Sequence, residues 1–296
     1  MNIGILASGG DAAGMNYCLY KIVKQLYKSN NISMFRYGYK GLIEDDKVPF
    51  DIKQLYENRY NGGIFIGTSR CKEYETQEGI DKAINTYIKN NLDVLIVMGG
   101  NGSFKGSIEL VKAGKNVLFI PCSIDNDVND SDYSIGFDSA CEKCLDYIRT
   151  VNYTMVSFDR ACIYEVMGRK CDKIANYVAS VLHPDYLYTS EKNNFSDCAK
   201  SIIDGYNQGH TPFVILRENL INLDELKKYI QDNTNREIRS CVIGYYQRGG
   251  KPTIREEKLA EIIANMCVKC IKNKTFNRQI LLKKVENKYV PYILEY

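Results

Sequence analysis

The chain has 296 residues, enough for one large domain or two smaller ones. Hydrophobic residues make up 45% of it, charged residues 25%, and the formal net charge is only +3. This composition is typical of a globular protein, and the balanced charge argues against nucleic-acid binding. No run approaches the ~20 apolar residues that span a bilayer, and the first residues carry no secretory signal, so we expect a cytoplasmic protein with no membrane partner.

Short apolar runs rich in β-branched residues alternate with amphipathic stretches along the whole chain. The expected strands are 2–6, 33–37, 94–98, 117–121, 161–166, 213–216 and 241–245. The expected helices are 15–28, 79–90, 104–113, 139–153, 173–182, 196–207, 223–231 and 256–272. Strand–helix alternation predicts an α/β fold with mostly parallel sheets covered by helices, whose ligands bind at the carboxyl ends of the strands.

The residues that follow each expected strand differ between the two halves of the chain. Glycines and acidic residues dominate the first half, and arginines dominate the second. We therefore expect two lobes. The first comprises residues 1–137 with 248–280, and the second comprises 138–247 with the extreme carboxyl terminus.

The eleven cysteines are best interpreted as reduced, small hydrophobic residues. Two C-x-x-C pairs occur, Cys141 with Cys144 and Cys267 with Cys270. They could form a four-thiolate zinc site, but the flanking patterns favour i, i+3 positions on helices.

Two Gly-Gly turns, at Gly9-Gly10 and at Gly99–Ser103, stand between a strand and a helix. Glycine lets the backbone approach a ligand closely, and the first N–H groups of a helix attract anions. The pair of turns predicts a phosphate site. Neither turn is a Walker loop, because no Gly-Lys-Ser/Thr follows.

Asp125 and Asp127 follow another strand at positions i and i+2. In an extended segment the two carboxylates would point the same way, so that one could take a proton from a hydroxyl and the other could hold Mg²⁺. An Asx-rich turn with no catalytic role is the alternative. Several arginines stand at or near strand ends and favour a sugar-phosphate site: Arg160, Arg169, Arg239 and Arg248.

These motifs together resemble the 6-phosphofructokinases of the bacterial ATP-dependent type. The resemblance runs in order to about residue 265 and is carried by residues 3–16, 62–70, 99–103, 121–127, 132–137, 165–169 and 244–250. It implies two Rossmann-like lobes, one for the nucleotide and one for the sugar phosphate. It also implies transfer of the terminal phosphoryl group of Mg-ATP to the 1-hydroxyl of fructose 6-phosphate in glycolysis.

The resemblance also assigns roles to single residues. Asp125 would accept the hydroxyl proton, and Ser123, Arg70 and Arg169 would assist. ATP would be surrounded by Gly10, Arg70, Cys71, Gly100, Asn101, Gly102 and Ser103, with Mg²⁺ at Asn101 and Asp127. The sugar phosphate would be held by Ser123, Ile124, Asp125, Met167, Gly168, Arg169, Glu218, Tyr245, Tyr246, Gln247 and Arg248. Arg160 and Arg239 match positions that reach a neighbouring subunit, which implies a homo-oligomer, a tetramer in most relatives.

Several residues depart from the family pattern. Asn101 stands where the family has a metal-binding aspartate, so we expect weaker metal use and slower turnover. Tyr245 replaces a histidine. Gly102 leaves room for the inner phosphate of a nucleotide, and with Cys122 it favours ATP over pyrophosphate. The positions that bind phosphate effectors in the family keep one cation, Lys24, so little effector response is expected.

Two alternative functions stay open at this point. A catalytically weak paralogue could serve as a binding or regulatory subunit. A pyrophosphate-dependent kinase is the other alternative.

Overall fold

The computed structural model describes residues 1–296, and the chain divides into two compact units. Unit 1 comprises Met1–Ser139 and Arg248–Tyr296, and unit 2 comprises Ala140–Gln247. The expected α/β fold with mostly parallel sheets is confirmed. No helix is long and apolar enough to cross a membrane.

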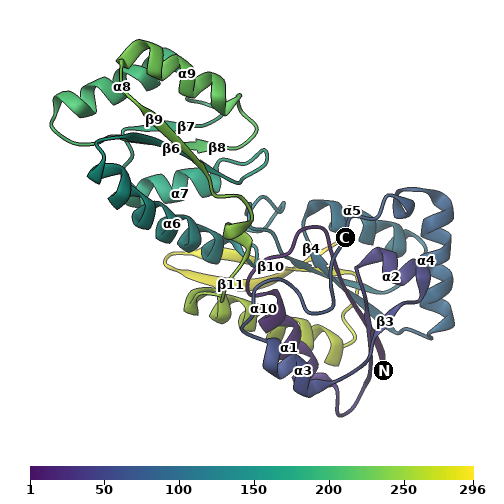
Figure 1. Cartoon of the computed structure of the whole chain (residues 1–296). Coiled ribbons are helices and arrows are strands. Elements are labelled where there is room, and N and C mark those ends of the chain that lie inside the picture. The colour runs from purple at the N-terminus through teal and green to yellow at the C-terminus, as the bar shows by residue number, and fades with distance from the viewer. The chain divides into compact units, whose positions relative to one another are not determined.

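Unit 1 is built on a seven-stranded sheet in the order β11-β10-β5-β4-β1-β2-β3 (Figure 1). The strands are β1 (Asn2–Ser8), β2 (Asn31–Phe35), β3 (Lys47–Val48), β4 (Val94–Gly99), β5 (Val117–Pro121), β10 (Arg278–Val285) and β11 (Lys288–Glu295). The run from β10 to β2 is parallel, and only the outer strands β3 and β11 are antiparallel to their neighbours. The central strands are buried on both faces, which is why they are almost continuously apolar.

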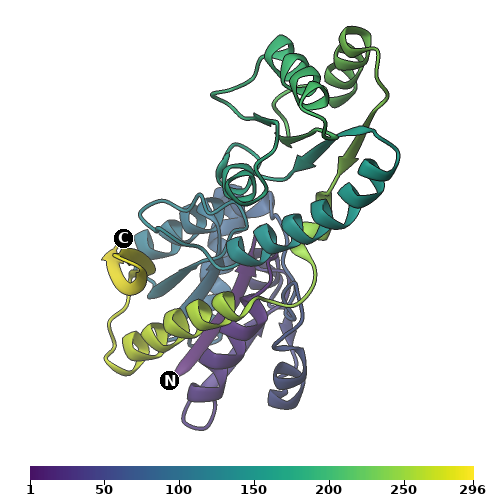
Figure 2. The same cartoon turned by 90° about the vertical axis from the view of Figure 1, so that its left-hand side faces the viewer.

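Helices cover this sheet. They are α1 (Met15–Leu26), α2 (Tyr39–Glu44), α3 (Ile52–Asn58), α4 (Gln77–Lys89), α5 (Asn101–Lys112) and α10 (Ile254–Lys272), with a 3₁₀ turn η1 (Glu73–Glu75). Helices α1 and α10 lie side by side (Figure 2), joined by the Lys21–Glu261 ion pair at 2.7 Å.

Unit 2 contains a parallel sheet in the order β7-β8-β6-β9. The strands are β6 (Ala161–Val166), β7 (Tyr186–Tyr188), β8 (Phe213–Arg217) and β9 (Ile238–Val242). The helices are α6 (Phe137–Ser157), whose residues from Ala140 onward belong to this unit, α7 (Lys173–Leu182), α8 (Phe195–Asn207) and α9 (Leu223–Thr234). Side chains alternate across a strand, so Ala161 and Ile163 pack on the face covered by α8 and α9.

The structure corrects two expectations about strands. Residues 244–248 form a 3₁₀ helix, η2 (Gly244–Arg248), and the strand before it covers 238–242 rather than 241–245. The extreme carboxyl terminus does not belong to the second lobe. Its hairpin of β10 and β11 extends the unit 1 sheet, because Arg278 and Gln279 pair with β5.

Both C-x-x-C pairs lie on helices, at i, i+3 positions of α6 and α10, and all four thiols are buried. The structure brings together no group of three or more side chains that could ligate a metal through His, Cys, Asp or Glu.

Candidate active site

Three loops of unit 1 begin next to one another at the carboxyl ends of β1, β4 and β5. Ser8 pairs with Gly99, and Gly99 pairs with Pro121, so the strands end in register. The hydroxyl of Ser103 donates to the carbonyl of Ser8 over 2.8 Å, which ties the second Gly-Gly turn to the first. A Cβ atom at Gly99 would lie 2.3 Å from the Ser103 oxygen, so only glycine fits there. The structure thus joins the two predicted turns.

The helices that follow these turns have open amino termini. Neither Gly14 before α1 nor Gly100 before α5 supplies a side-chain cap, and their first turns contain no acidic residue. Five other helices are capped by side chains: Asp51, Thr76, Asn194, Asn222 and Thr253. Uncapped N–H groups at a helix amino terminus are suited to binding an anion. A Cβ at Gly102 would contact nothing within 4 Å, so space adjoins the first turn of α5.

The loop after β5 presents Asp125 half-buried, not in the core. The segment is a turn, the alternative considered from sequence, and not an extended segment, since buried Asn126 has φ of 52°. The Asn126 side chain accepts a hydrogen bond from the Ser134 N–H at 2.7 Å and donates to the Asp132 carbonyl at 3.2 Å. These bonds fix the turn that carries Asp125.

Ser123 connects the two carboxylate-bearing residues of this loop. Its hydroxyl accepts from the Asp125 N–H at 3.2 Å and donates to the Asp127 carboxylate at 3.1 Å. Ile124, predicted to contact the sugar, is buried and 1% exposed. Its side chain therefore belongs to the core of unit 1, which leaves only its backbone for a ligand.

Asn101 uses both ends of its amide inside the protein. Its Nδ2 donates to the Asp127 carbonyl at 2.9 Å, and its Oδ1 accepts from the Asn129 N–H at 3.2 Å. The side chain therefore links the first residue of α5 to the loop that follows Asp125.

The remaining predicted nucleotide residues of unit 1 have different environments. Arg70 is exposed, and Cys71 is half-buried against the core cluster beneath α4. Arg248 donates to the Asp11 carbonyl at 2.8 Å, and its guanidinium lies 2.7 Å from where a Cβ at Gly10 would be. The resemblance grouped Arg248 with the sugar-phosphate residues, whereas its contacts here are with the glycine turn after β1.

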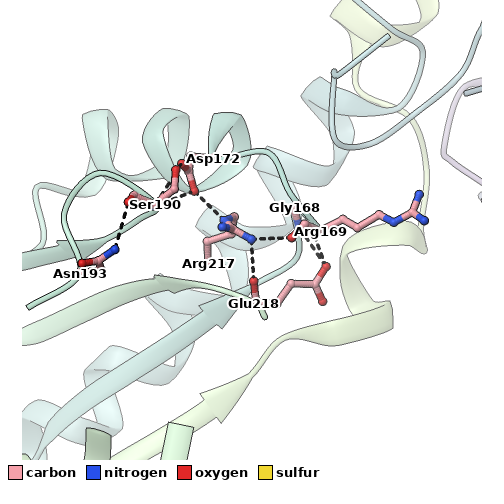
Figure 3. Close-up of polar contacts among 7 residues, drawn as sticks. All are labelled: Gly168, Arg169, Asp172, Ser190, Asn193, Arg217 and Glu218. Atoms are coloured by element: carbon pink, nitrogen blue, oxygen red, sulfur yellow. Dashed lines mark hydrogen bonds and ion pairs between the residues drawn. The ribbon is translucent and has the colours of Figure 1, made fainter. Parts of the chain in front are cut away.

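In unit 2 the loop after β6 is held by a carboxylate from the neighbouring strand end. Oε1 of Glu218 accepts hydrogen bonds from the N–H groups of Gly168, at 3.1 Å, and Arg169, at 2.9 Å (Figure 3). Arg169 has a left-handed φ of 55°, and its side chain extends away from these contacts. At Gly168 a Cβ would lie 2.4 Å from the Cys171 carbonyl, so this turn requires glycine.

Sequence reasoning missed Arg217 and Asp172, which complete this network. Arg217 is 6% exposed and forms an ion pair with Asp172 at 2.6 Å. Arg217 also stands at the end of a strand, but no spacing rule links it to Asp172, which lies 45 residues earlier in the chain.

The predicted arginines Arg160 and Arg239 are brought together by another missed residue, Glu237. The Glu237 carboxylate pairs with Arg160 at 2.6 Å and also with Arg239. The two cations therefore share one carboxylate at the β9 edge of the unit 2 sheet.

The three residues before Arg248 differ in exposure. Tyr245 is 83% exposed, and Tyr246 donates its hydroxyl to Asp146 at 2.9 Å. Gln247 is buried, and its Oε1 accepts from the Met167 N–H at 3.2 Å and from the Cys144 thiol at 2.9 Å. The Gln247 side chain therefore supports the Met167 loop, which leaves only the backbone of Gln247 for the predicted contact with the sugar phosphate.

Glu256, fully buried on α10, is a further ionisable group of unit 1. It accepts hydrogen bonds from the N–H groups of Gly136 and Ser139, at 2.9 and 3.2 Å, where α6 begins. Burial raises the pKa of this carboxyl group to about 7, and the hydrogen bonds offset only part of that shift.

Comparison with known proteins gives a consistent result. The family model described as Phosphofructokinase matches residues 2–271. ATP-dependent 6-phosphofructokinase of Clostridium botulinum (strain Loch Maree / Type A3) is 35% identical over 292 residues, which cover 96% of this chain and 90% of the relative. The enzyme of the same name from Alkaliphilus metalliredigens (strain QYMF) is 34% identical over 284 residues, covering 95% and 89%.

Solved structures agree with the family match. Phosphofructokinase from Saccharomyces cerevisiae has a TM-score of 0.85 and 28% identity, covering 98% of this chain and 44% of the yeast chain. A pyrophosphate-dependent phosphofructokinase from Marinobacter aquaeolei has a TM-score of 0.87 at 16% identity, covering 99% and 81%. The second similarity shows a shared fold alone.

Proposed function

The chain belongs to the phosphofructokinase family, and we propose that it transfers the terminal phosphoryl group of ATP to the 1-hydroxyl of fructose 6-phosphate. One observation carries the proposal. The turn that bears half-buried Asp125 follows β5, and the two glycine turns follow the next two strands of the sheet, β4 and β1, at the same edge. A candidate base and a candidate triphosphate site thus share one edge of one sheet.

In this proposal the phosphates of ATP lie against the open amino terminus of α5. The residues involved are Gly10, Gly100, Asn101, Gly102 and Ser103, with Arg70 and Cys71 beside them. The open space at Gly102 supports a nucleotide, because an inner phosphate needs room there. Exposed Arg70 would neutralise charge on the group in transfer.

The residues of the Asp125 loop are suited to Mg²⁺. This ion takes one or two carboxylates and completes its shell with phosphates and water. Asp125 and Asp127 provide such carboxylates, and Ser123 orients the Asp127 carboxylate by donating to it. Asp127 would hold the ion, and the Asn101 oxygen would add a ligand only through its second lone pair. When bound, Mg²⁺ would offset the negative charge of the phosphates.

Asp125 would accept the proton of the 1-hydroxyl as the phosphoryl group arrives. Phosphoryl transfer asks the protein mainly for positioning and charge stabilisation, so the base needs to be ionised and within hydrogen-bond reach. The bonds of Asn126 to Ser134 and Asp132 keep the turn in place.

In unit 2 the sugar phosphate would contact Met167, Gly168, Arg169, Glu218, Tyr245 and Tyr246. The outward guanidinium of Arg169 supports this role, because its planar fork matches a phosphoryl group. Oε1 of Glu218 holds the loop, which leaves its second oxygen to accept from a sugar hydroxyl. Arg248 would bind phosphate from its position beside Gly10.

Arg160 and Arg239 would act on a neighbouring copy in a homo-oligomer, most simply a tetramer, in the cytoplasm. Their shared partner Glu237 supports the two acting as one cationic patch.

A donor-exchange assay tests the proposal. The purified protein is given fructose 6-phosphate and Mg²⁺ with either ATP or pyrophosphate, and fructose 1,6-bisphosphate is measured. We expect product with ATP and at most a trace with pyrophosphate. Tight calorimetric binding of either substrate without turnover would instead support the weak-paralogue function.

A further inference from the structure

One buried guanidinium in unit 2 contacts the backbone of both residues proposed to hold the sugar. Nη1 of Arg217 donates to the carbonyl of Arg169 and, over 2.9 Å, to the carbonyl of Glu218 (Figure 3). Its Nε donates to Asp172 at 2.6 Å. These three bonds connect the loop after β6, the end of β8 and the residue that precedes α7.

The strand register explains why one side chain can serve both loops. Arg217, the last residue of β8, pairs with Val166, the last residue of β6. The Glu218 N–H donates to the Val166 carbonyl at 2.9 Å, so the ladder continues one residue beyond the strands. The loops therefore leave the sheet side by side, and Arg217 lies where they separate.

The loop after β6, which Arg217 holds, is not in a relaxed conformation. Arg169 has a left-handed φ of 55°, which costs a side-chain-bearing residue free energy and persists only where its surroundings enforce it. Two groups enforce it here: Glu218 accepts from the Arg169 N–H, and Arg217 donates to the Arg169 carbonyl. Both ends of this residue are thereby fixed.

Asp172 fixes the orientation of Arg217 in turn. It stands at the N-cap of α7 but gives that helix no side-chain cap, because its carboxylate is directed to Arg217 and to Ser190. Ser190 donates to Asp172 through both its N–H and its hydroxyl, and Asn193 donates to the Ser190 carbonyl at 3.0 Å (Figure 3). The pair is thus anchored in the segment after β7.

We propose that Arg217, oriented by Asp172, is a positioning residue that sets the affinity for the sugar phosphate by fixing Arg169 and Glu218. This rests on the proposed function of those two residues. Arg217 is only 6% exposed, and its Nε and Nη1 groups donate to acceptors within the protein. A change at Arg217 should therefore alter the affinity for the sugar phosphate and leave the affinity for ATP unchanged.

Steady-state kinetics of Arg217→Lys provide the test. Lysine keeps the charge beside Asp172 but cannot donate from a planar fork to three acceptors at once. We expect the KM for fructose 6-phosphate to rise at least tenfold, equivalent to about 1.4 kcal/mol, with the KM for ATP changed less than twofold. Reduced folding alone would lower apparent kcat and leave both KM values unchanged.

A second variant is needed because a single substitution at Arg217 or Asp172 can leave a buried charge unpaired and destabilise the fold. Arg217→Met with Asp172→Asn removes both charges together, which avoids that penalty. The matched control is Arg236→Met, because Arg236 forms an exposed Arg–Asp pair with Asp159 at 3.1 Å in the same unit. The control should keep wild-type KM values.

The outcome is decided on variants whose thermal unfolding is cooperative. A folded Arg217→Lys or double variant with a KM for fructose 6-phosphate within twofold of wild type would overturn the proposal. A parallel rise in both KM values would overturn it too, since it would indicate general distortion. If wild type itself shows no turnover, the affinities of wild type and variants for fructose 6-phosphate are compared by calorimetric titration. Failure of the proposed reaction is thereby distinguished from failure of the positioning role of Arg217.

Discussion

Replacing Asn101 by aspartate separates a structural role for this residue from a role as metal ligand. Asparagine donates to the Asp127 carbonyl at 2.9 Å and accepts from the Asn129 N–H at 3.2 Å. A carboxylate can still accept from Asn129, but its second oxygen would face the Asp127 carbonyl with no hydrogen between them. One favourable contact becomes a repulsive one.

The magnitude follows from the lost bond. Leaving a partly buried acceptor without its donor costs about 1–3 kcal/mol. In a domain of this size that loss lowers Tm by roughly 3–10 °C. The added charge beside the Asp125 and Asp127 carboxylates acts in the same direction when no metal is bound. We therefore expect Asn101→Asp to be less stable in metal-free buffer and to turn over no faster than wild type.

Thermal unfolding with and without Mg²⁺, combined with turnover at several Mg²⁺ concentrations, tests this expectation. Gly102→Asp is the matched control for stability. It adds the same carboxylate one residue along, where a Cβ meets no atom within 4 Å and no hydrogen bond is lost. An Asn101→Asp protein with unchanged Tm and several-fold faster turnover would refute the structural role and favour an impaired metal site in the wild type.

Two further predictions concern unit 1. The pKa of Glu256 is about 7 in the folded protein and about 4.5 in the unfolded chain. Between these pH values the folded state binds more protons than the unfolded state, so the free energy of unfolding falls as pH rises from about 4.5 to 7. Urea unfolding at several pH values should show that Glu256→Gln removes this slope, and an unchanged slope would contradict the assignment. Gly102→Asp should raise the KM for ATP on the order of tenfold by repelling an inner phosphate, with the KM for fructose 6-phosphate unchanged. Equal ATP affinity would show that no phosphate lies there.

The sequence predicts the parts of this fold that depend on local pattern. The central strands β4, β5 and β6 are mostly apolar and bounded by turn residues, which is why the ranges 117–121 and 161–166 match β5 and β6 residue for residue. The strands of the carboxyl-terminal hairpin were not predicted, because exposed residues such as Lys283 and Lys284 interrupt the apolar pattern. Its pairing with β5 is a contact between segments far apart in the chain, which no local pattern records.

The same limit applies to the site. Gly9-Gly10, Gly99–Ser103 and Asp125 could be recognised because phosphate loops and strand-end carboxylates have local signatures. Arg217 and Asp172 could not be paired from sequence, since 45 residues separate them and only the register of β6 and β8 brings their loops together. The inward direction of the Gln247 side chain could not be predicted either, because its neighbours Tyr245 and Tyr246 are exposed.

The most direct test compares the initial rate of fructose 1,6-bisphosphate formation by wild type and Asp125→Asn at saturating ATP, Mg²⁺ and fructose 6-phosphate. Asparagine keeps the shape of the side chain and removes the base, so we predict a kcat lower by roughly 10²–10⁴-fold with KM values for both substrates nearly unchanged. Equal kcat values in the two proteins would contradict the assignment of Asp125 as the group that accepts the hydroxyl proton.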